Sequence, residues 1–187
     1  MSEVILDRSN DYWPTPILPV VPLIQHLPHS FTYIEPCAGM FHLVNHINTL
    51  TEGRGECLEA YDAFPQNDDV IEKDGRDITA KDLYGADYII TNPPWTRNKQ
   101  SGYLMHALIE NFSDLAPTWL LFDSNWANTV QASTLITDRL VKIQAIGRVK
   151  WVEGSAHTST KDASWYLFDA NKNKPTEFYG RAPKESN

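Results

Sequence analysis

Short apolar runs alternate with a helix-like repeat over most of the chain. Residues 31–36, FTYIEP, combine aromatic and β-branched side chains and stop at a proline, which predicts a short strand. Over residues 41–50, FHLVNHINTL, apolar side chains recur at every third position, which predicts a helix with one buried face. A turn containing Ala38 and Gly39 connects the two. Strand, tight turn and helix form the first unit of a βα fold.

Three further apolar runs predict strands at residues 56–62, 86–92 and 116–123, and a helix is expected at residues 103–112. Strands that alternate with helices favour a mostly parallel sheet covered on both faces. Residues 144–152 and 163–170 are separated by a polar loop without a helical pattern, so they suit an antiparallel C-terminal hairpin. The expected fold class is therefore α/β, a single-domain, Rossmann-like, doubly wound and mostly parallel sheet.

The two ends of the chain have different patterns from the middle. Residues 11–22 contain Pro14, Pro16, Pro19 and Pro22, which argue against a regular helix and predict an extended, stiff segment. Residues 171–187 are rich in Lys, Pro and Asn and read as a polar C-terminal tail. We expect one domain over residues 1–170, followed by this tail.

Composition narrows the function classes. The chain has 187 residues and no apolar stretch long enough to span a bilayer, and its first residues lack a signal-peptide pattern, so a cytoplasmic protein without a membrane partner is expected. Its two cysteines, Cys37 and Cys57, lack metal-ligand spacing, so no metal site is expected. A formal charge of -8 opposes binding to phosphate, so any contact with nucleic acid must be local. Arg97 and Lys99, in a polar loop that we expect to close over substrate, are candidates.

Polar residues follow the predicted strands, where a doubly wound sheet binds its ligands. They are Glu35 with Cys37, Ala38 and Gly39 after the strand at residues 31–36, and Asp62 after the strand at residues 56–62. Asp77 and Ile78 stand where a third strand, before the run at residues 86–92, should end, and Asn92 ends that run, the fourth strand. A glycine turn lets backbone lie against a ligand, and a carboxylate accepts two hydrogen bonds from ribose hydroxyls. Met40 and Phe41 replace the second glycine of a phosphate-binding loop, which disfavours a dinucleotide. Taken alone, these residues would also suit a strand cap and a surface turn.

Asn92, Pro93, Pro94 and Trp95 form the most informative motif. Two prolines fix the backbone, so the Asn92 side-chain oxygen and the Pro93 carbonyl can point to one place, and Trp95 offers a flat face for a base. These acceptors could hold the two N–H groups of a planar amine and aim its lone pair at an electrophilic methyl group. The alternative is a purely structural Pro-Pro turn.

In these motifs the chain resembles the class I S-adenosylmethionine-dependent methyltransferases, in particular the small phage-type DNA N6-adenine group. EPCAG looks like the cofactor motif and NPPW like the catalytic motif of that family. The resemblance implies that S-adenosylmethionine is the cofactor, that Asp62 contacts its ribose, and that Asp77 and Ile78 contact its adenine ring. DYWPTP is similar to the family's Trp-x-Thr-Pro segment, so Trp13, Thr15 and Pro16 would cover the methionine side.

The function that the resemblance implies is methylation of adenine N6 in DNA, with the base flipped out of its stack onto Trp95. Two alternatives stay open. The acceptor could be an RNA base or a glutamine amide in a protein, or the chain could be a binding or inhibitory protein that keeps the cofactor fold without turnover. The chain has no segment of the size of the separate target-recognition domain of many relatives, which disfavours a defined recognition sequence.

Overall fold

The computed structural model of the chain describes residues 13–95, 101–151 and 158–181, with only the backbone for residues 101–103. One sheet runs through the described chain in the strand order β3-β2-β1-β4-β5-β7-β6-β8. The strands are β1 Phe31–Glu35, β2 Gly55–Asp62, β3 Ile71–Glu72, β4 Tyr88–Thr91, β5 Thr118–Asp123, β6 Leu140–Arg148, β7 Asp162–Phe168 and β8 Glu177–Tyr179. Only β7 runs against its neighbours, β5 and β6. The predicted α/β fold with an antiparallel C-terminal hairpin is confirmed.

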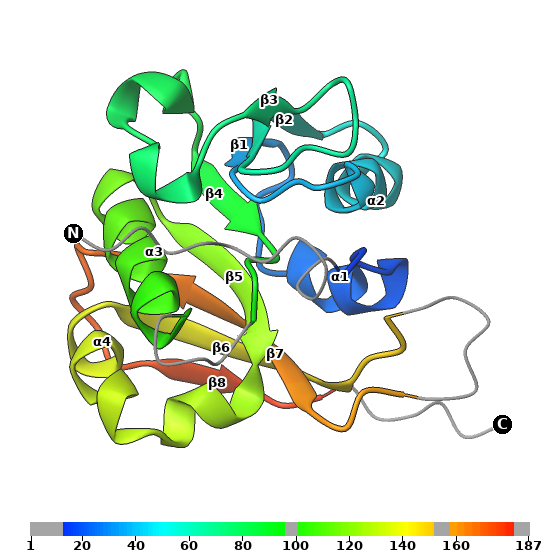
Figure 1. Cartoon of the computed structure of the whole chain (residues 1–187). Coiled ribbons are helices and arrows are strands. Elements are labelled where there is room, and N and C mark those ends of the chain that lie inside the picture. Colours follow the sequence, from blue (N-terminus) through cyan, green and yellow to red (C-terminus); the bar gives the residue numbers. More distant parts are fainter. Residues whose placement is uncertain (1–12, 96–100, 152–157, 182–187) are drawn as a thin grey trace, which may run out of the picture.

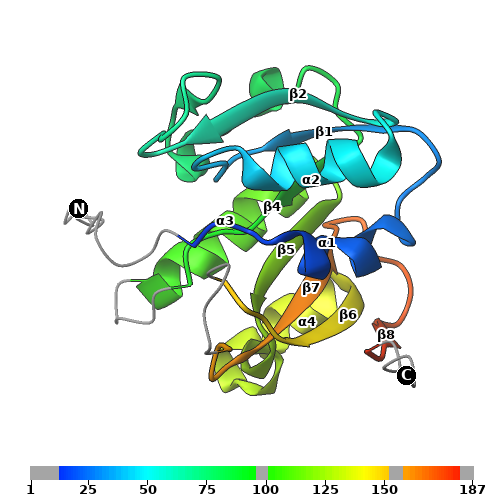
Figure 2. The ribbon, with the colours of Figure 1, turned by 90° about the vertical axis from the view of Figure 1, so that its right-hand side faces the viewer.

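Helices cover both faces of this sheet (Figures 1 and 2). They are α1 Ile17–Ile24, α2 His42–Thr51, α3 Ser101–Leu115 and α4 Ser133–Asp138, with short 3-10 turns at Gly75–Asp77, Ala80–Leu83, Ser124–Asn128 and Val130–Ala132. Figure 2 shows α1 and α2 in front of the strands and α3 behind them. One core cluster, containing Val20, Leu43 and Trp165, lies under α1 and α2, and a second, containing Leu108 and Phe112, lies under α3.

The prediction of an extended segment up to Pro22 is wrong, because α1 begins at Ile17. Pro16 stands at the helix N-cap and Pro19 in the first turn, where a missing N–H leaves no intrahelical bond unmade. Pro22 lies inside the helix, and burial offsets the bond that it removes: Val20 and Leu23 are fully buried. The Trp165 indole N–H also donates to the Pro19 carbonyl at 2.8 Å. Tertiary packing therefore overrides the local preference of these prolines.

Two further boundaries differ from the sequence pattern. β3 has only two residues, both exposed, and ends at Glu72 rather than near Asp77. β6 begins at Leu140, four residues before the predicted run at residue 144. Within the segment expected to be a tail, β8 pairs in parallel with β6 through Ile143 and Phe178. Every helix in the described ranges is too short or too polar to pass through a lipid bilayer.

Candidate functional site

A cavity of about 460 Å³ lies where β1, β2 and β4 end. Ten of the predicted site residues line it: Trp13, Thr15, Glu35, Cys37, Ala38, Asp62, Asn92, Pro93, Pro94 and Trp95. Because the three strands are parallel, their carboxyl ends share one edge of the sheet, and residues from distant parts of the sequence meet there. Pro16 caps α1 beside the cavity without lining it. Arg97 and Lys99 lie outside the described residues.

Asp62 holds the turn after β1 in place. Its carboxylate accepts hydrogen bonds from the backbone N–H of Gly39 at 2.8 Å and of Phe64 at 2.7 Å. Gly39 has a positive φ of 52°, a conformation that glycine adopts without steric cost. Each carboxylate oxygen can accept more than one hydrogen bond, so Asp62 keeps acceptor capacity toward the cavity that it lines.

Phe41 stands where a phosphate-binding loop has its second glycine, and it retains a glycine-like backbone. Its φ of 70° and ψ of 15° are left-handed, and it is the N-cap of α2. A left-handed conformation costs a residue with a side chain about 1 kcal/mol or more. The Phe41 ring packs against two core clusters, which offsets this cost. The turn therefore keeps its shape without the second glycine.

The cavity has an acidic wall. Glu35, Asp62, Glu72 and Asp74 line it, and its lining among the described residues includes no Lys or Arg. Glu35 is 1% exposed, and its Oε2 atom has no hydrogen-bond partner in the described chain. Burial, reinforced by the charge of Asp62, raises the pKa of Glu35 well above its usual value. An acidic wall suits a cationic ligand, whose positive charge beside Glu35 would in turn favour the ionised form of this unpartnered carboxyl.

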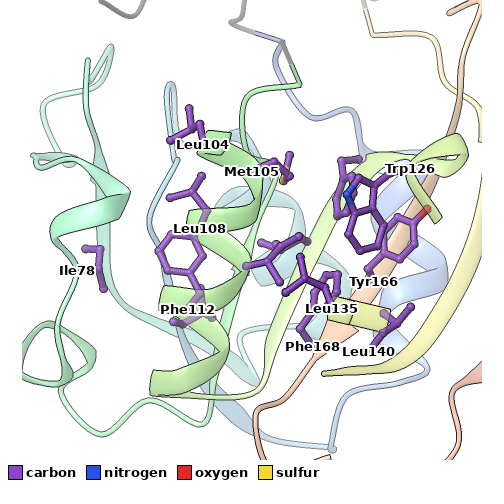
Figure 3. Close-up of a cluster of buried hydrophobic side chains, with 14 of the residues drawn as sticks. Ile78, Leu104, Met105, Leu108, Phe112, Trp126, Leu135, Leu140, Tyr166 and Phe168 are labelled. Carbon is purple, nitrogen blue, oxygen red and sulfur yellow. The ribbon is translucent and has the colours of Figure 1, made fainter. Parts of the chain in front are cut away.

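The expected adenine contacts, Asp77 and Ile78, do not line the cavity. Asp77 is exposed, and Ile78 is 2% exposed in the core beside Leu108 and Phe112 of α3 (Figure 3). Asp74, the N-cap of the 3-10 turn, and Gly75, its first residue, line the cavity instead. The reason is that β3 ends five residues earlier than a strand reaching Asp77 would require.

Close packing fixes the backbone at Gly75. A Cβ atom there would lie 3.0 Å from the Phe112 ring and 3.1 Å from Leu108, so only glycine fits without displacement. The Asp74 side chain accepts from the Arg76 backbone N–H at 2.8 Å and pairs with its guanidinium. Hydrogen bonds from Arg76 lower the pKa of Asp74, so this cavity carboxylate is ionised at neutral pH.

The Asn92 side chain is held from both ends. Its Nδ2 donates to Thr15 Oγ1 at 3.1 Å and to the Trp13 carbonyl at 3.3 Å. Its Oδ1 accepts from the indole N–H of Trp95 at 2.9 Å. A carbonyl can only accept and an indole N–H can only donate, so these partners fix which way the amide is turned. Oδ1 keeps one lone pair for a further donor.

Trp95 is partly buried. Its N–H also donates to the Leu121 carbonyl at 3.0 Å, and the ring contacts both core clusters. Trp151, after β6, meets it edge to face with ring centroids 5.1 Å apart and an interplanar angle of 85°. Trp95 and Trp151 thus form an aromatic corner beside Asn92.

Several lining residues were not predicted from sequence: Glu72, Asp74, Gly75, His42 and Phe64. The Asp-Gly pair at 74–75 is a turn signal that could have been used. Nothing near Trp151 in the sequence marks it, because its place depends on the pairing of β6 and β7. Among the described residues, no group of three or more His, Cys, Asp or Glu side chains is arranged to hold a metal ion.

No protein-family model matches the chain, and no curated protein matches it in sequence. Solved structures match its fold. One is a Listeria monocytogenes protein described as a class I S-adenosylmethionine-dependent methyltransferase, with a TM-score of 0.62, 10% identity, and coverage of 97% of this chain and 69% of that one.

Two other solved structures are also similar. A modification subunit of a type I restriction enzyme from Vibrio vulnificus has a TM-score of 0.55 and 14% identity, over 96% of this chain and 49% of that one. NSun6 from Pyrococcus horikoshii has a TM-score of 0.53 and 17% identity, over 83% and 52%. The chain thus spans about half the length of these two. It has the Rossmann-like fold that it shares with a class I methyltransferase.

Proposed function

We propose that this protein transfers a methyl group from S-adenosylmethionine to an exocyclic amine, the N6 atom of adenine in DNA. The observation that carries the proposal is the shared cavity of Asp62 and Asn92. A carboxylate suited to a nucleoside and an amide suited to an amine therefore open onto one space.

The acidic wall supports the choice of cofactor. S-adenosylmethionine carries a positively charged sulfonium and an ammonium group, and both are favoured near carboxylates. Glu35, with its unpartnered oxygen, and Asp62 would hold the cationic and ribose parts, and Asp74 with Gly75 would border the adenine ring. Bound in this way, the cofactor supplies an electrophilic methyl group on sulfur.

The Asn92 environment supports the choice of acceptor. Its Oδ1 has one lone pair left after the Trp95 bond, and the Pro93 carbonyl follows it in the chain. Two acceptors on a rigid turn hold both N–H groups of a planar amine and turn its lone pair toward the methyl group. The nitrogen then forms a bond to the methyl carbon while the carbon–sulfur bond breaks, sulfur keeps the electron pair, and the nitrogen releases one proton to solvent.

Adenine in DNA is favoured among such amines for two reasons. The Asn-Pro-Pro-Trp and Trp-x-Thr-Pro motifs resemble those of DNA N6-adenine methyltransferases. Relatives in fold include a restriction-modification subunit and a type IIG restriction endonuclease, BpuSI, matched with a TM-score of 0.51. Trp95 and Trp151 add aromatic surface for a base that has left its stack.

Parallel transfer assays would test the proposal. Isotope-labelled methyl donor is incubated with duplex DNA, with RNA and with protein, and the products are digested and identified by mass spectrometry. The expected product is N6-methyladenine from DNA. Label found in RNA bases or in glutamine, and not in DNA, would show that the acceptor is RNA or protein instead. Intact cofactor binding with no label in any of the three pools would support a binding protein without turnover.

A further inference from the structure

The chain's net negative charge is concentrated in one part of the sequence. Residues 52–87 contain eleven Asp and Glu and only four Lys and Arg, whereas residues 139–161 contain five Lys and Arg and one Glu. The first segment includes β2 and β3, at one edge of the sheet, and the second includes β6, near the opposite edge. The molecule is therefore electrically polarised, and its overall charge of -8 does not describe the basic side.

Strand pairing brings part of the basic segment to the cavity. In the strand register, Ala163 at the start of β7 lies opposite Asp123 at the end of β5. Arg148 at the end of β6 lies opposite Asp162, the first residue of β7. Because β5 is parallel to β4, the end of β6 and the start of β7 lie at the same edge of the sheet as Asn92. Figure 1 shows the chain leaving β6 and entering β7 on the same side of the molecule.

Exposed cations flank the aromatic corner at this point. Arg148 and Lys150 are exposed, and neither takes part in the ion pairs found among the described residues. The Lys161 side chain is 49% exposed, and its Nζ lies 3.7 Å from an Asp123 oxygen, a loose pair that leaves the ammonium open to solvent. Trp151, between these cations in sequence, contacts Trp95. Cations beside an aromatic face are the combination that binds a nucleic-acid backbone next to an unstacked base.

We propose that Arg148, Lys150, Trp151 and Lys161, the β6–β7 rim, dock the sugar-phosphate backbone of DNA beside the target base. This inference rests on the proposed function. The rim attracts phosphate, while the acidic segment at residues 52–87 repels it, so DNA approaches over β5–β7 and leaves the cofactor side of the cavity uncovered. The cofactor end of the cavity thus favours a cation, and the end beside the β6–β7 rim favours an anion.

A double variant, Lys150→Gln with Lys161→Gln, tests the rim. DNA binding is measured by fluorescence anisotropy with an adenine-containing duplex over a range of salt concentrations. Each phosphate contact contributes about one unit to the slope of log affinity against log salt, so the slope should fall by about two. The control, Lys81→Gln with Lys174→Gln, removes the same charge from exposed sites away from the rim and should keep the wild-type slope and affinity.

The outcomes separate this inference from the proposed function. Calorimetric binding of S-adenosylmethionine to the rim variant should equal that of the wild type, since neither lysine lines the cavity. If the wild type methylates DNA and the rim variant keeps the wild-type salt slope, the rim does not dock DNA and the proposed function stands. An equal fall in slope in the control variant would also overturn the proposed role of the rim, because the net charge of the whole protein would then explain the binding of DNA. If the wild type neither binds nor methylates DNA, both proposals fall.

Discussion

The indole N–H of Trp95 donates a hydrogen bond to Asn92 Oδ1 at 2.9 Å. The side chain expected to stack on a base therefore also orients the amide expected to hold it. The same N–H contacts the Leu121 carbonyl, which ties the NPPW turn to the neighbouring strand β5. Trp95 consequently has two separable roles, one through its ring and one through its N–H.

Replacing Trp95 in two ways separates these roles. Trp95→Phe keeps an aromatic face and removes the N–H, so kcat should fall about fivefold, the effect of losing a hydrogen bond of about 1 kcal/mol, with little change in KM for DNA. Trp95→Ala also removes the ring, and KM should rise because a stacking face contributes about 1 to 3 kcal/mol per base. Steady-state kinetics on a DNA duplex measures both. A Phe variant with wild-type kcat would remove the orienting role.

Thr15 should position Asn92 without touching the target base. Thr15→Val keeps the shape and removes the acceptor for Asn92 Nδ2, whereas Thr15→Ser retains it. We expect the Val variant to lose about fivefold in kcat, again about 1 kcal/mol, and the Ser variant to recover most of it. Wild-type kcat in the Val variant with a loss in the Ser variant would show that packing of the buried Thr15 methyl group, and not its hydroxyl, matters.

Asp62 should control cofactor affinity. Asp62→Ala removes the acceptor of the Gly39 and Phe64 N–H groups as well as a ligand for ribose, so S-adenosylmethionine binding should weaken by about 1 to 3 kcal/mol. Isothermal calorimetry measures this directly. Asp68→Ala, an exposed carboxylate in the following loop, is the matched control and should bind as the wild type does. Unchanged affinity in Asp62→Ala would take this residue out of the site.

Glu35 should make folding stability depend on pH. The pKa of Glu35 is raised in the folded state, so the folded chain holds this proton more tightly than the unfolded chain. Relative to Glu35→Gln, the wild-type free energy of unfolding should be constant below the usual value of 4.5 and should fall as pH rises from there through the raised pKa. The slope approaches about 1.4 kcal/mol per pH unit. Free energies of unfolding, measured with urea, that differ between the wild type and Glu35→Gln by the same amount at every pH would contradict the raised pKa of Glu35.

The sequence was most informative where strands are buried and parallel. β1 and β4 are dense in apolar residues, so their ends, and with them Glu35 and Asn92, could be located. β3 could not be located in this way, because its two residues are exposed and carry no apolar pattern. That is why Asp77 was expected in the cavity, whereas Asp74 lines it.

Long-range packing accounts for the remaining differences. α1 forms despite its prolines because Val20 and Leu23 are buried against the sheet, a contact that no local pattern encodes. Trp151 reaches Trp95 only because β7 inserts between β5 and β6. Pairing of strands distant in sequence is set by the whole fold, so the aromatic corner became visible only in three dimensions.

The kinetic behaviour of Asn92→Ala tests the central claim most directly. Loss of one preorganised acceptor should reduce kcat for methylation of DNA by about 100- to 1,000-fold, by comparison with deletion of an oxyanion-hole donor. S-adenosylmethionine affinity and the circular dichroism spectrum should stay close to those of the wild type, because Asn92 is a partly exposed residue beyond the end of β4. A folded Asn92→Ala protein that methylates adenine at the wild-type rate would show that the NPPW turn is structural and would contradict the proposed function of this site.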